Sequence, residues 1–184
     1  DPALIEERIT DKTKAIIVAS VYGHPADMDK IMAIAKKHNL KVIEDCAEVH
    51  GATYDGKMCG TFGDIACFSF YGNKIIATGE GGMCLTNDDA LAEEMRKLKN
   101  HYFGNPRFLH DKLGYNYRMT NIHAAIGVAQ VVYADKLIQS RIDNAQLYSK
   151  LLAPLDFFNL PACRDNVKNV YWMYGITIKD TSKI

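Results

Sequence analysis

The sequence predicts an α/β fold with a mainly parallel sheet, and two runs of residues carry that prediction. Residues 14–20, KAIIVAS, are apolar and rich in β-branched residues, whereas residues 27–39 repeat apolar positions at the spacing of an amphipathic helix. Residues 40–47, LKVIEDCA, have the pattern of a second strand. Strand, helix and strand in this order normally form a right-handed crossover between parallel strands, so a parallel sheet is expected.

Turn and cap residues set the limits of the elements that come first. Pro25 suits the entry into the helix, and Asn39 sits where a helix commonly ends. The pair Asp55-Gly56 is a turn signal for a small hairpin. Residues 64–70, DIACFSF, are almost wholly apolar and are expected to form a fully buried strand.

The rest of the chain predicts one more strand and then mainly helices. Residues 83–87 form a short strand, and residues 88–100 form a helix whose acidic start and basic end match the helix dipole. Residues 100–119 are aromatic, basic and turn-rich, which indicates an ordered loop. Residues 120–152 contain no proline and one glycine, so one or two long helices are expected, with Thr120 or the next residue as the cap.

Composition argues against several classes of partner. Lys and Arg number 22 and so do Asp and Glu, so no overall charge draws the chain to nucleic acid or to an anionic membrane. The uncharged apolar stretches are much shorter than the roughly 20 residues that a membrane span needs. Five widely spaced cysteines, with no CxxC pair or Cys/His cluster, indicate core thiols in a cytoplasmic protein rather than disulfides or a metal site.

The ends of the chain indicate a piece of a longer protein. The chain begins at Asp1 rather than at a methionine, and it stops soon after the strand-like residues 171–178, YWMYGITI. A domain boundary is expected near residue 150. Residues 1–150 would then be part of a large domain, and residues 151–184 would begin a truncated C-terminal one.

Polar side chains stand at the carboxyl ends of two predicted strands, which is where ligands collect in a parallel sheet. Glu44 and Asp45 end one strand, and Ser69 and Lys74 lie at or just beyond the end of another. Taken singly, each acid fits a helix cap or a solvated turn, and Lys74 fits an ordinary surface charge. A lysine set against close-packed backbone and partly desolvated is, however, the kind that forms Schiff bases.

The glycine run GEGG at residues 79–82 adds to this pattern. Its glycines permit positive φ and let a flat ligand approach the backbone, although a plain turn would use them as well. A pyridoxal cofactor needs an amine for its aldehyde, a carboxylate for its ring nitrogen and donors for its phosphate. Lys74, Asp45 and Ser69 supply one group for each.

Two segments carry a resemblance to a known family. They are residues 21–88, from VYGHPADMDK to GGMCLTND, and residues 114–130, GYNYRMTNIHAAIGVAQ. These segments resemble the DegT/DnrJ/EryC1/StrS family of pyridoxal-phosphate-dependent nucleotide-sugar aminotransferases, and the resemblance covers roughly residues 5–155. It implies the central part of the large domain of a fold-type-I aminotransferase, a mainly parallel sheet with flanking helices, followed by the start of a small C-terminal α/β domain.

The resemblance implies a role for five residues. Lys74 would form the Schiff base with pyridoxal 5′-phosphate and shuttle the proton, and Asp45 would pair with the pyridinium nitrogen. Glu48 matches a position near the ring hydroxyl, and Ser69 would hydrogen-bond the phosphate. Asn116 resembles the asparagine that reaches the phosphate from a neighbouring subunit, which implies a homodimer with shared active sites.

Two more residues have open roles in this comparison. His50, in EVHGA, fits core packing as well as substrate contact. Arg118, in NYRM, fits a structural ion pair as well as a functional role.

The resemblance also implies a substrate class. It is strongest to members that aminate C4 of a GDP-linked 4-keto-6-deoxy sugar, with glutamate as donor, for the synthesis of cell-surface glycans; dTDP- and UDP-linked sugars and 3-amination remain alternatives. Related sugar 3-dehydratases have a histidine at the lysine position, so Lys74 favours transamination. The rival interpretations are a non-enzymatic regulator with the same fold and a nucleotide enzyme with GEGG as its phosphate loop, although the spacing is not GxGxxG.

Overall fold

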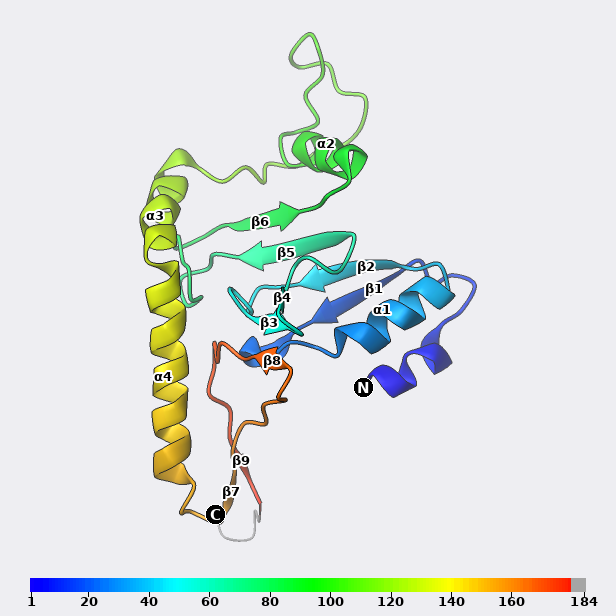
Figure 1. The fold of residues 1–184 in the computed structure, drawn as a ribbon. Coiled ribbons are helices and arrows are strands. Elements are labelled where there is room, and N and C mark those ends of the chain that lie inside the picture. The colour runs from blue at the N-terminus through cyan, green and yellow to red at the C-terminus, as the bar shows by residue number, and fades with distance from the viewer. Residues whose placement is uncertain (180–184) are drawn as a thin grey trace.

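The protein is built on a four-stranded sheet, shown in the computed structural model of Figure 1, which describes residues 1–179. The strand order is β1 (Ala15–Ala19), β2 (Lys41–Asp45), β5 (Ile65–Ser69), β6 (Gly82–Leu85). The first three strands are parallel, and β6 is antiparallel to β5. The predicted α/β class and mainly parallel sheet are therefore confirmed.

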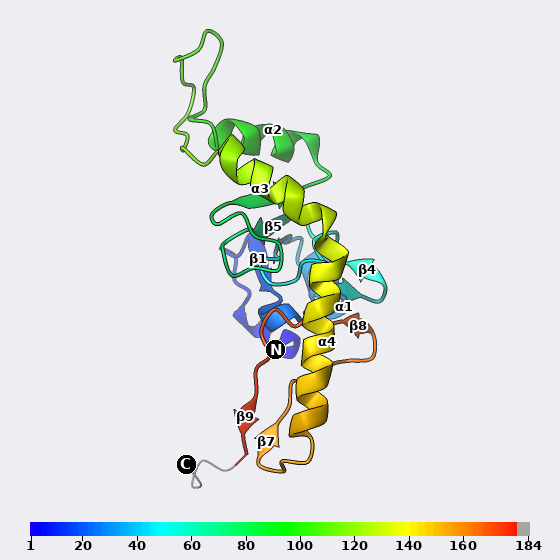
Figure 2. The same ribbon diagram turned by 90° about the vertical axis from the view of Figure 1, so that its left-hand side faces the viewer.

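Helices and short strands surround this sheet. The 3₁₀ turns are η1 (Pro2–Leu4), η2 (Glu6–Arg8) and η3 (Val21–Gly23), and the α-helices are α1 (Met28–Lys37), α2 (Asp89–Leu98), α3 (Asn121–Val132) and α4 (Ala134–Leu152). The short strands are β3 (Thr53–Tyr54), β4 (Lys57–Met58), β7 (Phe158–Asn159), β8 (Val167–Lys168) and β9 (Thr177–Ile178). Figure 2 shows α3 and α4 running in sequence along one side of the sheet.

Local signals in the sequence explain where several elements turn or begin. The β3–β4 hairpin turns at Asp55 and Gly56, whose φ values of 47° and 74° are those of the turn that Asp-Gly favours. Helix α3 begins after Thr120, whose hydroxyl accepts a hydrogen bond from the backbone N–H of His123 at 3.3 Å. The long helical region is divided at Tyr133, so two helices form rather than one.

The apolar residues of the sheet alternate between a covered and an open face. Val18 and Val42 are buried against Met28, Ile31 and other residues of a cluster centred on α1. Ile17, one position away on β1, points to the other face and is 72% exposed. Strand β5 has one fully buried residue, Ala66. The expectation that residues 64–70 form a fully buried strand is therefore wrong.

The structure also corrects the expected strand at residues 171–178. Within this segment the strand is confined to Thr177–Ile178, because the preceding residues turn inward. The N–H of Val170 donates to the carbonyl of Gly23 at 3.1 Å, and Val170 and Trp172 are buried in the same cluster as Cys46 and Val49. Val170 and Trp172 are thus part of the core beside the sheet, whereas Ile176 and Ile178 are exposed.

The cysteine prediction holds in part. All five cysteines are free. Cys46 and Cys59 are buried, and burial raises the pKa of the Cys59 thiol to about 12. Cys84 and Cys163 are exposed, so they are not core thiols as expected.

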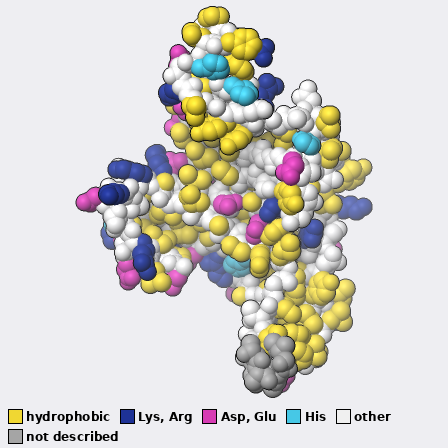
Figure 3. Space-filling view, turned by 180° about the vertical axis from the view of Figure 1, so that it is seen from behind, with side chains coloured by type: hydrophobic (Ala, Val, Ile, Leu, Met, Phe, Trp, Pro, Cys, Tyr) yellow, Lys and Arg dark blue, Asp and Glu magenta, His cyan; other side chains and the backbone are white. Residues whose placement is uncertain are grey.

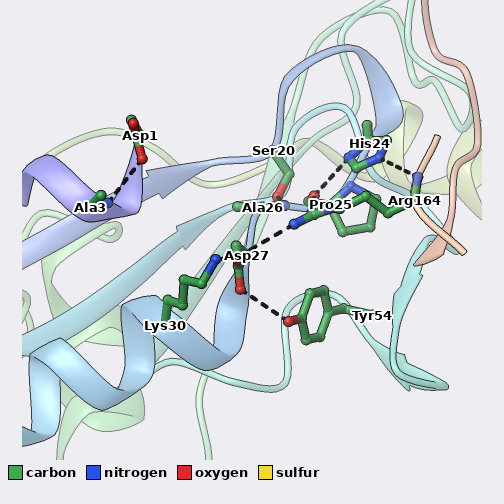
Figure 4. A network of polar contacts seen from close by, with 10 residues as sticks. All are labelled: Asp1, Ala3, Ser20, His24, Pro25, Ala26, Asp27, Lys30, Tyr54 and Arg164. Atoms are coloured by element: carbon green, nitrogen blue, oxygen red, sulfur yellow. Dashed lines mark hydrogen bonds and ion pairs between the residues drawn. The ribbon is translucent and has the colours of Figure 1, made fainter. Parts of the chain in front are cut away.

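A polar network fixes the entry to α1 against the C-terminal part of the chain, as Figure 4 shows. The hydroxyl of Tyr54 donates to Asp27 at 3.1 Å, and the guanidinium of Arg164 lies 3.8 Å from the same carboxylate. Arg164 also donates to the carbonyl of Pro25. Residue 164 is therefore bound to the turn that links β1 to α1.

Many large hydrophobic side chains of residues 1–179 are exposed at the surface. Ile122, Val128 and Val132 on α3 are 76%, 70% and 75% exposed. Figure 3 shows hydrophobic side chains gathered across the middle of the face seen from behind. Among residues 1–179, no helix is both long and apolar enough to cross a membrane.

Glu44 is a buried structural anchor. Its carboxylate accepts hydrogen bonds from the backbone N–H groups of Gly60 at 2.8 Å and of Phe62 and Gly63 at 2.7 Å each. The side chain is on the face of β2 that α1 covers, and the residue is 3% exposed. These bonds hold the loop between β4 and β5 against β2. Glu44 therefore has a structural role and is not assigned to ligand binding.

We expect Glu44→Gln to lower the free energy of unfolding of the full-length protein by about 2 to 3 kcal/mol, because the amide presents a donor where the carboxylate accepted and leaves a buried N–H unpaired. Urea unfolding of both proteins measures this. Glu7→Gln, at an exposed position, is the matched control and should leave the unfolding midpoint unchanged. A midpoint for Glu44→Gln equal to that of the control would contradict the anchor role.

Candidate functional site

The candidate site lies where β2 and β5 end. Because these strands are parallel and adjacent, Asp45 and Ser69 reach the same edge of the sheet from neighbouring strands. Alternation along β2 directs Asp45 to the face opposite Glu44. The Oδ1 atom of Asp45 accepts a hydrogen bond from the N–H of Ala47 at 3.1 Å, which fixes the carboxylate at the strand end.

Lys74 is not an ordinary surface lysine. It lies in the turns after β5, where its backbone N–H donates to the carbonyl of Tyr71 at 2.9 Å, and its side chain is 10% exposed. The Nζ atom is 3.8 Å from Oε1 of Glu48 and 3.8 Å from the centroid of the Trp172 ring. The amine is therefore held between a carboxylate and an aromatic face.

Glu48 joins Lys74 to the turn after β1. Its second oxygen, Oε2, accepts a hydrogen bond from the backbone N–H of Tyr22 at 2.6 Å. Tyr22 has a φ of 61°, a left-handed conformation that a non-glycine residue seldom adopts. The carboxylate thus stabilises an uncommon backbone conformation and places its other oxygen beside the amine.

The glycine run has a clear conformational role. Gly79 and Gly81 have φ values of 84° and 137°, as their residue type permits. A Cβ on Gly81 would come 2.6 Å from Cε of Met119, the flexible end of that side chain, so the backbone conformation at Gly81 is the stronger reason for a glycine there. A Cβ on Gly79 would meet nothing within 4 Å, so the surface there is open.

Ser69 and Asn116 occupy different surroundings. The hydroxyl of Ser69 accepts a hydrogen bond from the N–H of Tyr71 at 3.3 Å at the end of β5. Asn116 belongs to the segment between α2 and α3 and lines a hollow of about 370 Å³ together with Asn100 and Arg118. Within residues 1–179, the one ion pair or hydrogen bond that joins two of the five predicted residues is the Lys74–Glu48 pair at 3.8 Å.

Arg118 has a structural contact. Its Nη1 atom donates to Oδ1 of Asn100 at 3.5 Å, and its side chain lines the same hollow as Asn116. The weak hydrogen bond leaves most of the guanidinium at the surface of the hollow, so a functional role for Arg118 stays a prediction.

Sequence reasoning missed Trp172 as a site residue. The residue was expected in a strand of a separate domain, but its ring packs on Lys74 and its indole N–H donates to the carbonyl of Asn73 at 2.9 Å. The signal that was available is that Trp172 is the single tryptophan of the chain, in an apolar run of aromatic residues.

His50 is a neutral member of the core beneath the site. It is 4% exposed, and its ring stacks on that of Phe70 with centroids 5.9 Å apart. Neither ring nitrogen has a hydrogen-bond partner among the described residues. Burial, reinforced by the positive charge of Lys74, lowers the pKa of His50 to about 4.

This low pKa makes folding stability dependent on pH. Below about pH 6.5 the unfolded chain binds a proton at residue 50 that the folded protein does not bind until about pH 4, so stability falls as the pH falls through this range. We expect His50 to account for roughly 2 to 3 kcal/mol of that loss in the full-length protein. Urea unfolding at several pH values measures it.

The control for this measurement is His50→Leu, which removes the titrating group. Burial also lowers the pKa of His24, so the unmodified protein has a second contribution of the same sign. The two proteins are therefore compared with each other. Equal loss of stability between pH 7 and pH 4 in both would show that His50 is not responsible.

Comparison with known proteins identifies relatives over nearly the whole chain. A sequence profile of the DegT/DnrJ/EryC1/StrS aminotransferase family matches residues 1–183. The GDP-perosamine synthase of Escherichia coli O157:H7 is 49% identical over 173 residues, which are 94% of this chain and 47% of that protein. The GDP-perosamine synthase of Caulobacter vibrioides is 47% identical over 180 residues, or 97% of this chain and 48% of that protein.

Solved structures show the same relation. The structure of DesV from S. venezuelae in complex with a ketimine intermediate superposes with a TM-score of 0.92 at 34% identity. The match covers 100% of this chain and 49% of that one. The chain thus spans about half the length of the relatives that it matches.

Proposed function

Because the chain belongs to the DegT/DnrJ/EryC1/StrS aminotransferase family, whose members are pyridoxal-phosphate-dependent sugar aminotransferases, we propose that the full-length protein transfers an amino group from glutamate to a nucleotide-linked 4-keto-6-deoxy sugar. The observation that carries this proposal is the buried amine of Lys74, whose side chain is 10% exposed and whose Nζ atom lies 3.8 Å from the carboxylate of Glu48. A desolvated lysine beside a carboxylate is suited to covalent catalysis on a carbonyl compound.

The groups present fit pyridoxal 5′-phosphate. When bound, this cofactor supplies an electron sink that stabilises negative charge at the carbon that loses a proton. The site has an amine at Lys74, a carboxylate at Asp45, a hydroxyl at Ser69 and open backbone at Gly79. These are the chemical groups that an aldehyde, a protonated ring nitrogen and a phosphate need as partners.

Each residue has a distinct task in this proposal. The Nζ atom of Lys74 would hold the cofactor and would carry the proton during the transfer. The carboxylate of Asp45 would keep the ring nitrogen protonated, and the hydroxyl of Ser69 would donate to the phosphate. Glu48 lies beside Lys74, at 3.8 Å, and is assigned to the neighbourhood of the ring hydroxyl.

The proposed sugar substrate is GDP-4-keto-6-deoxymannose, with GDP-perosamine as the product used for cell-surface glycans. Similarity to two GDP-perosamine synthases, at 49% and 47% identity, supports a GDP-linked sugar over the dTDP- and UDP-linked alternatives. A purely regulatory protein with this fold is the rival proposal. The buried Lys74 and its partner Glu48 favour an enzyme, because a scaffold does not need a desolvated amine.

The full-length protein loaded with pyridoxal phosphate is expected to lose its visible absorption band on addition of glutamate and to regain it on addition of GDP-4-keto-6-deoxymannose. Lys74→Arg should lack the band and lose at least about a hundredfold in turnover, because arginine neither attaches the cofactor nor moves the proton. Absorption spectra and product masses measure both effects.

Controls separate the enzyme from its rivals. A panel with dTDP- and UDP-linked 3-keto and 4-keto sugars tests the assigned substrate, and preferential amination of one of these would overturn it. Lys36→Arg, at an exposed position of α1, is the matched control and should leave spectrum and turnover unchanged. Full activity in Lys74→Arg, or no cofactor band in the unmodified protein, would exclude the aminotransferase proposal.

Asn116 is proposed to complete the site of a neighbouring subunit in a homodimer. In heterodimers purified with two tags, Lys74→Ala paired with Asn116→Asp should have about half the activity of the unmodified dimer, because one of the two sites keeps both residues. Activity measurements on the purified heterodimers test this.

The matched control places both substitutions in one subunit and none in its partner. Shared sites would then both be damaged, so low activity is expected. If this control were about half active and the first heterodimer inactive, Asn116 would act within its own subunit and the shared-site proposal would fail.

A further inference from the structure

We propose that Trp172 is a positioning residue that holds the ε-amine of Lys74 whenever this amine is not covalently attached to the cofactor. The proposal rests on the function proposed above and adds a residue from the C-terminal end of the described chain. An aminotransferase lysine leaves and rejoins its cofactor in each half of the reaction, so the released amine needs a defined position from which to carry a proton.

The contact between the two side chains is close and shielded. The Nζ atom of Lys74 is 3.8 Å from the centroid of the indole ring, well within the about 6 Å at which a cation is attracted to an aromatic face. Trp172 is 8% exposed, and the Lys74 side chain is 10% exposed. Attraction of this kind is stronger in such a desolvated place than at an exposed surface.

The indole ring is held in position by its own contacts. Its N–H donates to the carbonyl of Asn73 at 2.9 Å, which links the ring to the residue just before Lys74. The segment around it is bound to the turn after β1, because the N–H of Val170 donates to Gly23 at 3.1 Å. Gly23 has a φ of 101°, and a Cβ there would come 2.7 Å from the N of Trp172.

Glu48 and Trp172, the two neighbours of the amine, act on it in different ways. Among the described residues, Glu48 is the one acid that forms an ion pair with Lys74, and its Oε1 atom lies 3.8 Å from Nζ. His50 is neutral, because burial and the charge of Lys74 lower its pKa to about 4. Glu48 therefore attracts the amine, whereas the fixed plane of Trp172 restricts where the amine rests.

A contact with a ring face also suits an amine that must move. The indole accepts no proton and forms no covalent bond, so it does not compete for the reactive electron pair. A cation–π contact is a non-covalent attraction, so the amine can leave the ring face and return to it. Simple core packing would not require the ring face to be turned to Nζ.

The test is the rate at which an amine-selective acylating reagent labels Lys74 in the full-length, cofactor-free protein, read by mass spectrometry of the peptide. Trp172→Met keeps much of the volume but removes the ring, and it should speed labelling about tenfold, because cover and attraction are lost together. Trp172→Phe keeps a ring face and should stay within about threefold of the unmodified protein.

Two further measurements separate positioning from stability. Ile138→Ala removes buried volume from the same core cluster on α4, and it should lower the urea midpoint without changing the labelling rate of Lys74. In the cofactor-loaded enzyme, Trp172→Met should lower kcat, and the change in kcat should be larger than the change in the KM for glutamate, because substrate contacts stay in place.

Three outcomes decide the proposal. Equal labelling of Lys74 in Trp172→Met, Trp172→Phe and the unmodified protein would overturn it, as would faster labelling in Ile138→Ala as well. Faster labelling in Trp172→Met alone supports it. The labelling needs no turnover, so a protein without aminotransferase activity but with ring-dependent labelling would refute the proposed function and leave the Trp172–Lys74 contact established.

Discussion

The placement of the site depends on the alternation of two neighbouring acids at the end of one parallel strand. Glu44 points to the covered face and binds three backbone N–H groups of the loop after β4, while Asp45 points to the other face at the edge of the sheet. A shift of one residue in the pairing of β2 with β5 would exchange these side chains. The buried anchor therefore fixes which of the two carboxylates lies on the face opposite α1 at the end of β2.

A second level of organisation comes from segments that are distant in the sequence. Lys74 follows β5, Glu48 follows β2, Tyr22 follows β1 and Trp172 lies beyond α4, yet contacts join all four. The backbone bond from Val170 to Gly23 closes this ring of segments. The amine thus depends on the three-dimensional assembly more than on any single loop.

This division explains what the sequence could predict. The crossover, the Asp-Gly turn, the Thr120 cap and the two helices follow from local periodicity and turn chemistry, which act within a few residues. Asp45, Ser69 and Lys74 could be predicted as site residues because strand ends are recognisable locally, and their roles stay predictions. Trp172 was not, because an apolar aromatic run fits a strand as well as a buried turn, and only the long-range contact with Asn73 decides between them.

The arrangement around Lys74 is compatible with large exposed apolar surfaces elsewhere in the chain. Ile17 on the open face of the sheet and Val132 on α3 are 72% and 75% exposed, and neither belongs to the two buried clusters. Lys74 is bound instead through Trp172, which belongs to a buried cluster together with Cys46, Val49 and Ile138. The position of the amine therefore depends on buried residues of this chain and not on these open surfaces.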